Sequence, residues 1–450
     1  MGKQEDGNEA DHNINERGPT VVSTTSSCPF APGEQAPNLL RKGYLFISHL
    51  REKAGVAPGS NSPVRTRMLF KPVTIVRGSQ GVELFYDADR IKRDGGMPAV
   101  VKGPLFGHNA VHTLDGEEHR VRKHQMADVA YDDAKVETFD ALVKAEVERV
   151  VAEWAHTPDT VYNGAALSFG RAAFKWAGIE LSAKEADRCA LQMADLVYEF
   201  GHPVKGHIKS WINRARLDKW AETIIEQVRA GEREAAEGTA LRAMAELTGP
   251  DGELIDARTA GIDLQNLTRP TIAVSLFASF AAGALVDHPE WVEKIRDGGE
   301  PVALAFAQEV RRLYPFVPML PAVSTTETEI QGCPVHKDER VIIDIYGTNT
   351  DPNEWEHPSS FDPNRFLSRE DLKSQADYEK ITAFIPQGGA GVYTGHRCPG
   401  EKIAVSALTS MVMALCRPEV VLSTDPADIR FPWNKMLTRS ETGMRVRVES

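Results

Sequence analysis

A glycine-rich loop that ends in one cysteine is the feature that most constrains this chain. Four glycines lie between Phe384 and Cys398, and Pro399 then leads into an apolar helical pattern. Glycines let backbone N–H groups approach a sulfur closely, where hydrogen bonds moderate its electron donation to a metal. A proline at a helix start brings the positive end of the helix dipole near the thiol and favours its ionisation. The loop therefore favours a metal-bound thiolate.

Other roles for Cys398 stay open on the evidence of this loop alone. An inert core cysteine and a reactive nucleophile at a helix start both fit its position. A zinc site with His396, Cys333 and His336 also fits by ligand type, although the spacings match no common zinc pattern. The choice among these roles depends on the rest of the chain.

The overall composition is that of an ordinary globular protein. Of the 450 residues, 42% are hydrophobic and 26% are charged, which is the usual globular range. The formal net charge of −12 argues against nucleic acid as a partner. The five cysteines are odd in number and scattered, and no spacing among them indicates a disulfide framework.

No segment predicts a signal peptide or a membrane span. Residues 1–6 lack the apolar run of a signal peptide. The longest apolar stretch covers residues 272–286 and is shorter than the roughly 20 residues needed to cross a bilayer. We therefore expect a buried core helix there, and a soluble, cytoplasmic protein without stable membrane association.

The polar start of the chain is expected to lie outside the folded domain. Residues 1–30 are acidic and rich in Ser, Thr and Asn, without apolar periodicity, which predicts a disordered leader. No internal repeat or long linker follows. Residues 31–450 are therefore expected to form one large domain.

Hydrophobic periodicity predicts a mainly helical fold with small β-sheets. Residues 118–310 repeat apolar positions at helical spacing, as over 136–154 and 183–200. Residues 69–85 alternate β-branched and polar positions around a turn at Gly78–Gly81, which predicts a small antiparallel sheet. The other predicted elements are a strand over residues 341–345, an irregular loop over 352–365, a long helix over 401–416 and closing strands.

Two further motifs accompany the cysteine loop in the same order as in one known family. Glu309 and Arg312 lie three apart on a helix with apolar neighbours, and a buried pair of this kind needs more partners. Arg365, in the loop over residues 361–366, is a candidate third member. Phe-x-x-Gln-Gly-Gly from Phe384, followed by Gly-His-Arg-Cys-Pro-Gly-Glu, resembles the haem-binding loop of the cytochrome P-450 superfamily.

The resemblance extends over roughly residues 36–447 and implies the cytochrome P-450 fold. It implies a haem-thiolate catalytic domain that binds haem b, with Cys398 as the ligand of the haem iron. It also implies that Glu309, Arg312 and Arg365 form a structural triad that braces the cysteine loop. Departures are small: Ala390 replaces a glycine common in the loop, and the acidic leader is additional.

The dipeptide Arg269-Pro270 breaks two local rules inside an apolar helical pattern. A proline within a helix costs about 3 kcal/mol or more and frees the carbonyl of Asn266. A buried arginine needs an anionic partner, because an unpaired buried charge is costly. Both violations at adjacent positions are typical of a functional site. In the structural alternative, Arg269 pairs with an acidic side chain and Pro270 only starts the helix.

Arg269-Pro270 stands where dioxygen-using members of the superfamily usually carry an acid and an alcohol. The pair resembles the fatty-acid peroxygenase branch, in which the arginine binds the substrate carboxylate through a bidentate contact. The carboxylate then assists heterolysis of hydrogen peroxide. The resemblance thus implies peroxide-driven oxidation of long-chain fatty acids near the carboxyl end, to α- or β-hydroxy acids, terminal alkenes or both. A redox partner is not required.

The resemblance also assigns residues around the haem. In residues 105–116, His112 matches a position near the haem that is commonly Gln in hydroxylating relatives and His in alkene-forming ones, and His is a proton donor suited to neutral pH. His119, Lys123 and His396 match positions that contact the haem propionates. The residues that match substrate-binding or channel positions are Leu105, Phe106, Val197, Phe200, Phe316 and Val317. From the sequence alone, each is also an ordinary loop, surface or core residue.

Two other functions remain as alternatives. A reductase-dependent haem-thiolate monooxygenase would oxidise a substrate without a carboxylate, and the missing acid–alcohol pair argues against it. A non-enzymatic haem sensor would call for an output domain, and the sequence shows no such domain.

Overall fold

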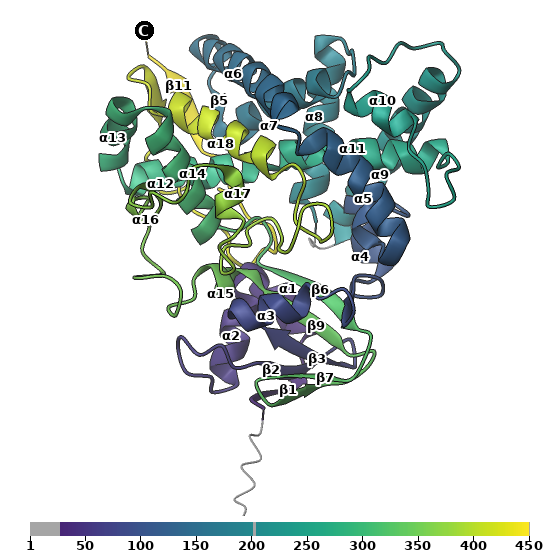
Figure 1. Cartoon of the computed structure of the whole chain (residues 1–450). Coiled ribbons are helices and arrows are strands. Elements are labelled where there is room, and N and C mark those ends of the chain that lie inside the picture. The colour runs from purple at the N-terminus through teal and green to yellow at the C-terminus, as the bar shows by residue number, and fades with distance from the viewer. Residues whose placement is uncertain (1–27, 201–203, 450) are drawn as a thin grey trace, which may run out of the picture.

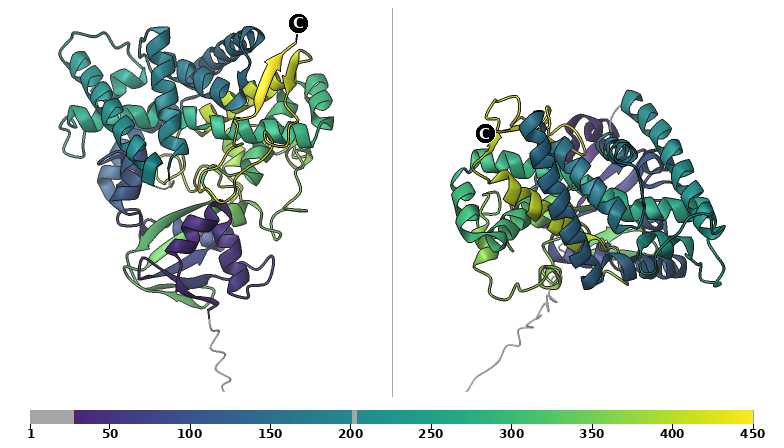
Figure 2. Two further views of the ribbon diagram at one scale, coloured as in Figure 1. Left: turned by 180° about the vertical axis from the view of Figure 1, so that it is seen from behind. Right: turned by 90° about the horizontal axis from the view of Figure 1, so that it is seen from above.

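The described chain divides into a helical body and a smaller part built around a sheet. A computed structural model describes residues 28–200 and 204–449. Most helices lie above the main sheet in Figure 1, and the view from behind in Figure 2 shows the same division. The predicted fold class, mainly helical with small sheets, is confirmed. The predicted leader over residues 1–30 lies outside the described residues except for 28–30.

The helical body contains the long helices, which include those predicted over residues 136–154, 183–200 and 401–416. They are α5 (Gly116–Ala130), α6 (Asp133–His156), α7 (Val161–Trp176), α8 (Ala183–Tyr198), α9 (Val204–Arg229), α11 (Ala257–Ala273), α12 (Ser275–Asp287), α13 (Glu290–Gly298), α14 (Glu300–Leu313) and α18 (Glu401–Leu415). The short helix α10 (Ala240–Ala245) packs against α5, α9 and α11. The short helices are α1 (Ala36–Lys42), α2 (Phe46–Lys53), α3 (Gly78–Phe85), α4 (Ala99–Phe106), α15 (Ile345–Asn349), α16 (Asn364–Leu367) and α17 (Gln375–Tyr378), with 3₁₀ turns at Gly43–Leu45 and Val111–Thr113.

Helix α6 illustrates how the sequence specifies these elements. The side chain of Asp132 accepts a hydrogen bond from the backbone N–H of Lys135 at 3.0 Å and caps the first turn. The helix then buries one apolar stripe, spaced three or four residues apart: Phe139, Val143, Val147, Val150, Val151 and Trp154. This stripe packs against α7 and α18 in the main hydrophobic core.

Helices α11 and α12 run through the centre of that core. The segment Ala257–Asp287 is long and apolar enough to cross a membrane by length and composition, but 83% of its most apolar window is buried inside the protein. Such a buried helix is also what the core of a soluble protein contains. The core helix predicted over residues 272–286 therefore lies where it was expected.

The main sheet has six strands in the order β1-β2-β3-β9-β6-β4. These are β1 (Phe30–Glu34), β2 (Val64–Met68), β3 (Lys71–Val76), β4 (Ile91–Lys92), β6 (Met319–Ser324) and β9 (Arg340–Asp344). Strands β2 and β3 form an antiparallel hairpin, and β3 pairs with β9 in parallel. Two smaller sheets join β10 (Val420–Leu422), β11 (Arg445–Val448) and β5 (Asp159–Thr160), and β7 (Thr328–Ile330) with β8 (Cys333–Val335).

The hairpin predicted around Gly78–Gly81 is wrong in its second half. Residues 82–85 belong to helix α3, and the partner of β3 is the preceding strand β2. Four alternating residues fit a strand or one turn of a buried helix equally well. Gly81 lies within this helix, and an added Cβ there would lie only 3.2 Å from the backbone of Val76.

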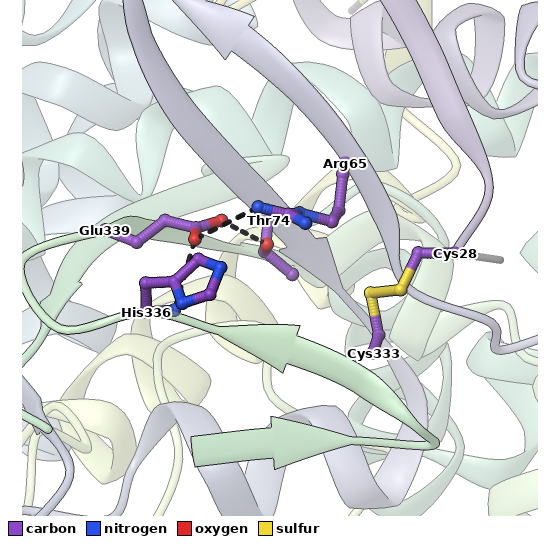
Figure 3. The surroundings of a disulfide bond; sticks show 6 residues. All are labelled: Cys28, Arg65, Thr74, Cys333, His336 and Glu339. Carbon is purple, nitrogen blue, oxygen red and sulfur yellow. Dashed lines mark hydrogen bonds and ion pairs between the residues drawn. A yellow bond between two sulfur atoms is a disulfide. The ribbon is translucent and has the colours of Figure 1, made fainter. Parts of the chain in front are cut away.

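A disulfide joins Cys28 to Cys333 across 305 residues of sequence. It ties the start of the described chain to β8 beside the main sheet (Figure 3). Nearby, Glu339 accepts a hydrogen bond from Thr74 at 2.5 Å and pairs with Arg65 at 3.5 Å. The scattered cysteines gave no signal for this bond, because nothing in the spacing relates two positions so far apart.

The disulfide also removes the zinc interpretation of Cys398. Cys333 is bonded to Cys28, and the His336 ring contacts Glu327 at 3.0 Å. Within residues 28–200 and 204–449, no group of three or more His, Cys, Asp or Glu side chains could hold a metal ion. The zinc interpretation is therefore wrong for the described chain.

We expect Cys28→Ser to lower the free energy of unfolding by about 2–4 kcal/mol, because the bond closes a long loop and restricts the unfolded chain. Cys333→Ser should have a similar effect. The double variant should lose no more than either single one, since each removes the same bond. Denaturant unfolding without reductant measures all three, and additive losses would contradict a contribution from the bond itself.

Candidate active site

The cysteine loop is held in shape by its own backbone. The N–H of Cys398 donates to the carbonyl oxygen of Gln387 at 3.0 Å. Gly388 has a φ of +99°, and a Cβ there would lie 2.6 Å from the carbonyl oxygen of His396. A side chain at this position is therefore excluded both by conformation and by space. The first of the glycines thus lets the two arms of the loop meet.

A buried carboxylate fixes the loop to the helices on either side. Glu401, the first residue of α18, accepts hydrogen bonds from Arg311 of α14 and from Arg397 at 3.0 Å. Arg311 also donates to the side chain of Gln387 at 2.9 Å. The side chain of Glu401 is fully buried, and a charge there is tolerated only with such partners. The sequence did not point to Arg311, since it is one of two adjacent arginines and only Arg312 belongs to the recognised motif.

Glu309, Arg312 and Arg365 come together behind this loop, as expected from the resemblance. Glu309 accepts from Arg312 at 2.7 Å and from Arg365 at 3.1 Å. It also accepts from the backbone N–H of Asp362 at 2.8 Å. Arg312 donates in addition to the carbonyl oxygens of Asn349 and Pro358. The cluster thus fixes the irregular segment over residues 352–365 to helix α14.

A cationic cluster lies beside the cysteine loop. The rings of His119 and His396 stack with centroids 4.3 Å apart. Lys123 donates to the carbonyl oxygen of Arg397 at 2.6 Å. Arg93 belongs to the same cluster, and one of its terminal nitrogens is buried without a hydrogen-bond partner among the described residues. Arg93 was not predicted, because it stands in a short polar segment without a motif.

The electrostatics of this cluster show unbalanced positive charge. Burial lowers the pKa of Lys123 to about 8 and the pKa of His119 to about 4, and Lys123 lowers the latter further. Burial also lowers the pKa of His396, with Arg93 and His119 adding to the effect. Both histidines are therefore neutral at pH 7. A ligand with negative charge at this position would relieve the repulsion.

The donor set around Cys398 fits a haem. Haem-thiolate ligation needs one cysteine, and the two haem propionates need cationic or hydrogen-bonding partners. His119, Lys123, His396 and the unpartnered nitrogen of Arg93 supply such an edge. Burial raises the pKa of the Cys398 thiol and outweighs the lowering effect of Lys123, so the protein alone favours the neutral thiol. Coordination to a metal deprotonates a thiol outright.

Arg269 lies within helix α11. Only 3% of the residue is exposed. It donates to the carbonyl oxygen of Leu105 and to the side chain of Asn266, the latter at 2.8 Å. Burial lowers its pKa to about 9, and Arg214 contributes to the shift, so the guanidinium is charged at pH 7. Its hydrogen-bond partners are both neutral.

The structural alternative for Arg269-Pro270 is therefore wrong in both parts. Arg269 forms no ion pair with a carboxylate among the described residues. Pro270 lies inside α11, which begins at Ala257, so it does not start the helix. The helix continues to Ala273 before a break at Val274. The core thus holds a proline inside a helix beside a buried charge that has no anionic partner among the described residues.

Phe106, His112 and Phe200 gather around Arg269. The Phe106 ring centroid lies 5.1 Å from that of His112 and 6.3 Å from that of Phe200. The guanidinium carbon of Arg269 lies 5.9 Å from the Phe106 ring centroid. Burial lowers the pKa of His112 to about 3, and the charge on Arg269 lowers it further. The His112 residue is nonetheless accessible to solvent.

Val197, Phe316 and Val317 lie in or against the same hydrophobic core. Val197 is buried in α8, and Phe316 is partly buried with its ring 6.3 Å from that of Phe277. Ordinary core packing accounts for these contacts. Their assignment to a substrate channel stays a prediction.

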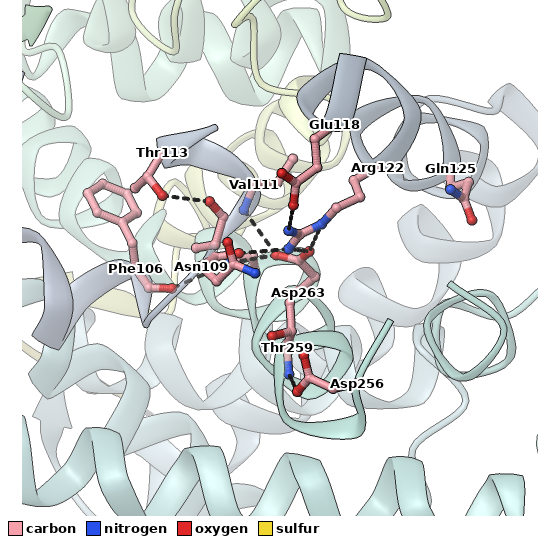
Figure 4. A network of polar contacts seen from close by, with 12 residues as sticks. Phe106, Asn109, Val111, Thr113, Glu118, Arg122, Gln125, Asp256, Thr259 and Asp263 are labelled. Atoms are coloured by element: carbon pink, nitrogen blue, oxygen red, sulfur yellow. Dashed lines mark hydrogen bonds and ion pairs between the residues drawn. The ribbon is translucent and has the colours of Figure 1, made fainter. Parts of the chain in front are cut away.

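A third buried carboxylate, Asp263, pairs with Arg122 beside the backbone of Val111 (Figure 4). Asp263 of α11 accepts from Arg122 of α5 and from the backbone N–H of Val111 at 3.3 Å. It also accepts from the side chain of Asn266 at 3.2 Å. Since Asn266 accepts in turn from Arg269, one carboxylate positions both the residue before His112 and the partner of the guanidinium.

Comparison with known proteins identifies the family. The family model described as Cytochrome P450 matches residues 301–441. The chain is 32% identical over 184 residues to cytochrome P450 76C4 of Arabidopsis thaliana, covering 38% of this chain and 34% of that protein. It is 26% identical over 253 residues to the putative cytochrome P450 137 of Mycobacterium tuberculosis, covering 54% and 50%. The matches thus span about a third to a half of these curated relatives.

Solved structures match almost the whole chain. Ligand-free cytochrome P450 OleT superposes with a TM-score of 0.85 at 29% identity, covering 93% of this chain and 97% of that one. A variant of cytochrome P450SP alpha (CYP152B1) superposes with a TM-score of 0.84 at 31% identity, covering 92% and 98%. The chain belongs to the cytochrome P450 family. The predicted P450 fold is confirmed, and membership of this family implies a haem.

Cys398→Ala should abolish the red-shifted Soret band of the ferrous carbonyl complex, because that band requires thiolate ligation of the P450 haem iron. Cys416→Ala is the matched control, since Cys416 is buried at the far end of α18. It should keep the band. Absorption spectra of the reduced, carbonyl-bound proteins decide the matter, and a red-shifted band in the Cys398 variant would contradict its role as ligand.

The apoprotein should lose stability as the pH falls below about 6.5, because buried His119 has a pKa of about 4 in the folded chain and about 6.5 when unfolded. Between these values the unfolded state binds more protons, so folding is favoured at the higher pH. His119→Gln should reduce the slope by up to about 1.4 kcal/mol per pH unit. Exposed His124→Gln should leave it unchanged.

Haem loading should weaken the same pH dependence, since propionates beside His119 would raise its folded pKa. Denaturant unfolding of apoprotein and haem-loaded protein at several pH values measures both slopes. Equal slopes in the two forms would place the propionates elsewhere.

Proposed function

We propose that this P450 is a peroxygenase that uses hydrogen peroxide to oxidise long-chain fatty acids near the carboxyl end. The observation that carries the proposal is Arg269, a buried guanidinium whose hydrogen-bond partners are all neutral. A buried charge of this kind needs an anion. A substrate carboxylate supplies it and matches the planar fork of a guanidinium.

Ligands of the structural relatives agree in chemistry with this proposal. A variant of P450 OleT was solved in complex with arachidonic acid, and it matches 94% of this chain at a TM-score of 0.85. P450SP alpha was solved in complex with (R)-ibuprofen, and it matches 92% at 0.83. Both ligands carry a carboxylate on an apolar body. Arg269, flanked by Phe106 and the core residues around it, offers the same combination of one cation and apolar walls.

One group of residues in this chain would hold the haem, and another would hold the substrate. Haem b, when bound, supplies the iron that reacts with peroxide and oxidises the substrate. Cys398 would bind the haem iron, and Arg93, His119, Lys123 and His396 would hold the propionates. On the distal side Arg269 holds the carboxylate and thereby fixes the α and β carbons in place. Positioning of this kind explains why oxidation would occur near the carboxyl end.

The proton transfer that peroxide needs is assigned to the bound carboxylate. Pro270 has no N–H, and neither Arg269 nor Pro270 can serve as the acid or the alcohol of a dioxygen-using P450. The carboxylate on Arg269 can take a proton from one oxygen of hydrogen peroxide and deliver it to the other. The fatty acid is then both the substrate and a condition of turnover.

His112 would act on the same side as a neutral imidazole. With a pKa of about 3 in the free protein, it carries one N–H and one free nitrogen at pH 7 and can donate or accept a hydrogen bond. Because its ring lies beside that of Phe106, which also contacts Arg269, His112 would lie near the carboxyl end of an acid bound by Arg269. The proposed products are α- or β-hydroxy acids, terminal alkenes, or a mixture that His112 influences.

Arg269→Gln should weaken fatty-acid binding by about 100-fold or more, because a charge-assisted bidentate contact is lost. Peroxide-driven turnover should fall at least as far. Arg269→Lys should recover part of the binding, since it restores the charge without the planar fork. Arg430→Gln removes an arginine whose side chain is 73% exposed and should behave as wild type.

The assay uses haem-loaded protein, hydrogen peroxide and saturated acids of several lengths, with gas chromatography of the products and a free-haem control. Parallel reactions with a fatty alcohol, and with NADPH and a reductase in place of peroxide, test the monooxygenase alternative. No product above free haem with peroxide and acid would overturn the proposal.

A further inference from the structure

A second buried arginine reaches the carbonyl oxygen to which Arg269 is bonded. Arg214 lies in helix α9 and is 2% exposed. Its Nη1 lies 3.5 Å from the carbonyl oxygen of Leu105, and Arg269 donates to the same oxygen. Two guanidinium groups from different helices thus meet at one neutral acceptor. Like charges repel at such short range, so this arrangement needs an explanation.

The buried charges around this point do not balance. Asp218 pairs with Arg214, and Asp263 pairs with Arg122, leaving Arg269 without an anion among the described residues. Each carboxylate is also held by a polar side chain of α11. Asp218 accepts from Gln265 at 3.1 Å, and Asp263 accepts from Asn266. Arg122 also reaches the half-exposed Glu118 at 3.4 Å, so among the buried groups of this cluster three guanidinium groups face two carboxylates.

The face of α9 that carries Arg214 is polar although it is buried. Ser210, Arg214 and Asp218 are spaced four residues apart and are each at most 6% exposed, so they share one side of the helix. The hydroxyl of Ser210 has no hydrogen-bond partner among the described residues. A buried polar group without a partner is rare in proteins and indicates a place where a ligand or water binds.

We propose that Arg214 and Arg269 together form a two-guanidinium site for the substrate carboxylate. The proposal rests on the proposed function and extends it to a residue outside the Arg-Pro motif. In the free protein the Leu105 carbonyl oxygen takes the place that the carboxylate occupies in the complex. A carboxylate has two oxygens and a full negative charge, so it can accept from both guanidinium groups and neutralise the excess charge.

Asp218 sets the strength of this site. Its carboxylate accepts hydrogen bonds from Nε of Arg214 at 2.7 Å and from Nη2 of the same side chain. It therefore competes with an incoming carboxylate for the positive charge of Arg214. The two members of the pair therefore have opposite effects on acid binding. Arg214 attracts the substrate, and Asp218 weakens that attraction. If the pair only joined α9 to α11, Arg214 and Asp218 would not have opposite effects on acid binding.

The test compares Arg214→Gln with Asp218→Asn in the haem-loaded, full-length protein. Tetradecanoic acid is the probe, and binding is followed by the shift of the haem absorption spectrum. Arg214→Gln should raise Kd about tenfold, the loss of one charge-assisted contact. Asp218→Asn should lower Kd several-fold, because the amide keeps the hydrogen bonds to Gln265 and Arg214 but removes the competing charge. Imidazole, a neutral ligand of the iron, should bind all forms alike.

Thermal unfolding of each variant separates the site from a structural role. If Arg214→Gln lowers stability but leaves Kd for the acid within twofold, the pair is structural and the proposal is overturned. If Arg214→Gln does not load haem, Asp218→Asn decides alone. Tighter acid binding then supports the proposal, and unchanged or weaker binding overturns it.

The outcomes also distinguish this inference from the proposed function. If wild-type protein does not bind the acid, or if Arg269→Gln binds it as wild type does, the carboxylate role of Arg269 fails and the Arg214 proposal fails with it. If binding depends on Arg269 but not on Arg214, only the second guanidinium is refuted.

Discussion

The buried carboxylate of Glu401 is the contact on which the position of Cys398 depends. It begins helix α18, and Arg311 of α14 and Arg397 of the loop converge on it. Breaking a buried pair by removing one partner costs far more than the pair itself contributes, because the remaining charge is left unpaired in a low-dielectric interior. The loop is thus held by side chains as well as by its glycines. In the same way, Glu309 with Arg312 and Arg365 fixes the irregular segment over residues 352–365 to helix α14.

The two sides of the site use buried charge in opposite ways. Behind the cysteine, Glu309 and Glu401 each lie between two guanidinium groups, and these contacts are complete without a ligand. On the distal side, Arg269 is left over after Asp218 and Asp263 have paired. A complete network makes a rigid support, whereas an incomplete one makes a binding site, since its missing charge has to come from a ligand.

Residues whose roles are local in sequence could be predicted, and those whose partners are remote could not. The glycine spacing before Cys398 and the misplaced pair Arg269-Pro270 are visible in short segments. Arg93 and Arg214 are single arginines in ordinary surroundings, and only the fold brings them to the site. The disulfide between Cys28 and Cys333 could not be predicted for the same reason, because 305 residues separate the two cysteines. The strand predicted over residues 82–85 was wrong for another reason, because four residues are too few to define a hydrophobic period.

The charge excess on the distal side also controls the protonation of His112. In the free protein, burial and the charge of Arg269 lower the pKa of His112 to about 3. A carboxylate bound to Arg269, as proposed, would cancel that charge and add an anion beside it, and both effects would raise the pKa of His112. By linkage, a proton on His112 would in turn favour carboxylate binding. The proposed function therefore predicts that substrate and proton are coupled through one guanidinium, and that the imidazole is a better proton acceptor when a fatty acid is bound.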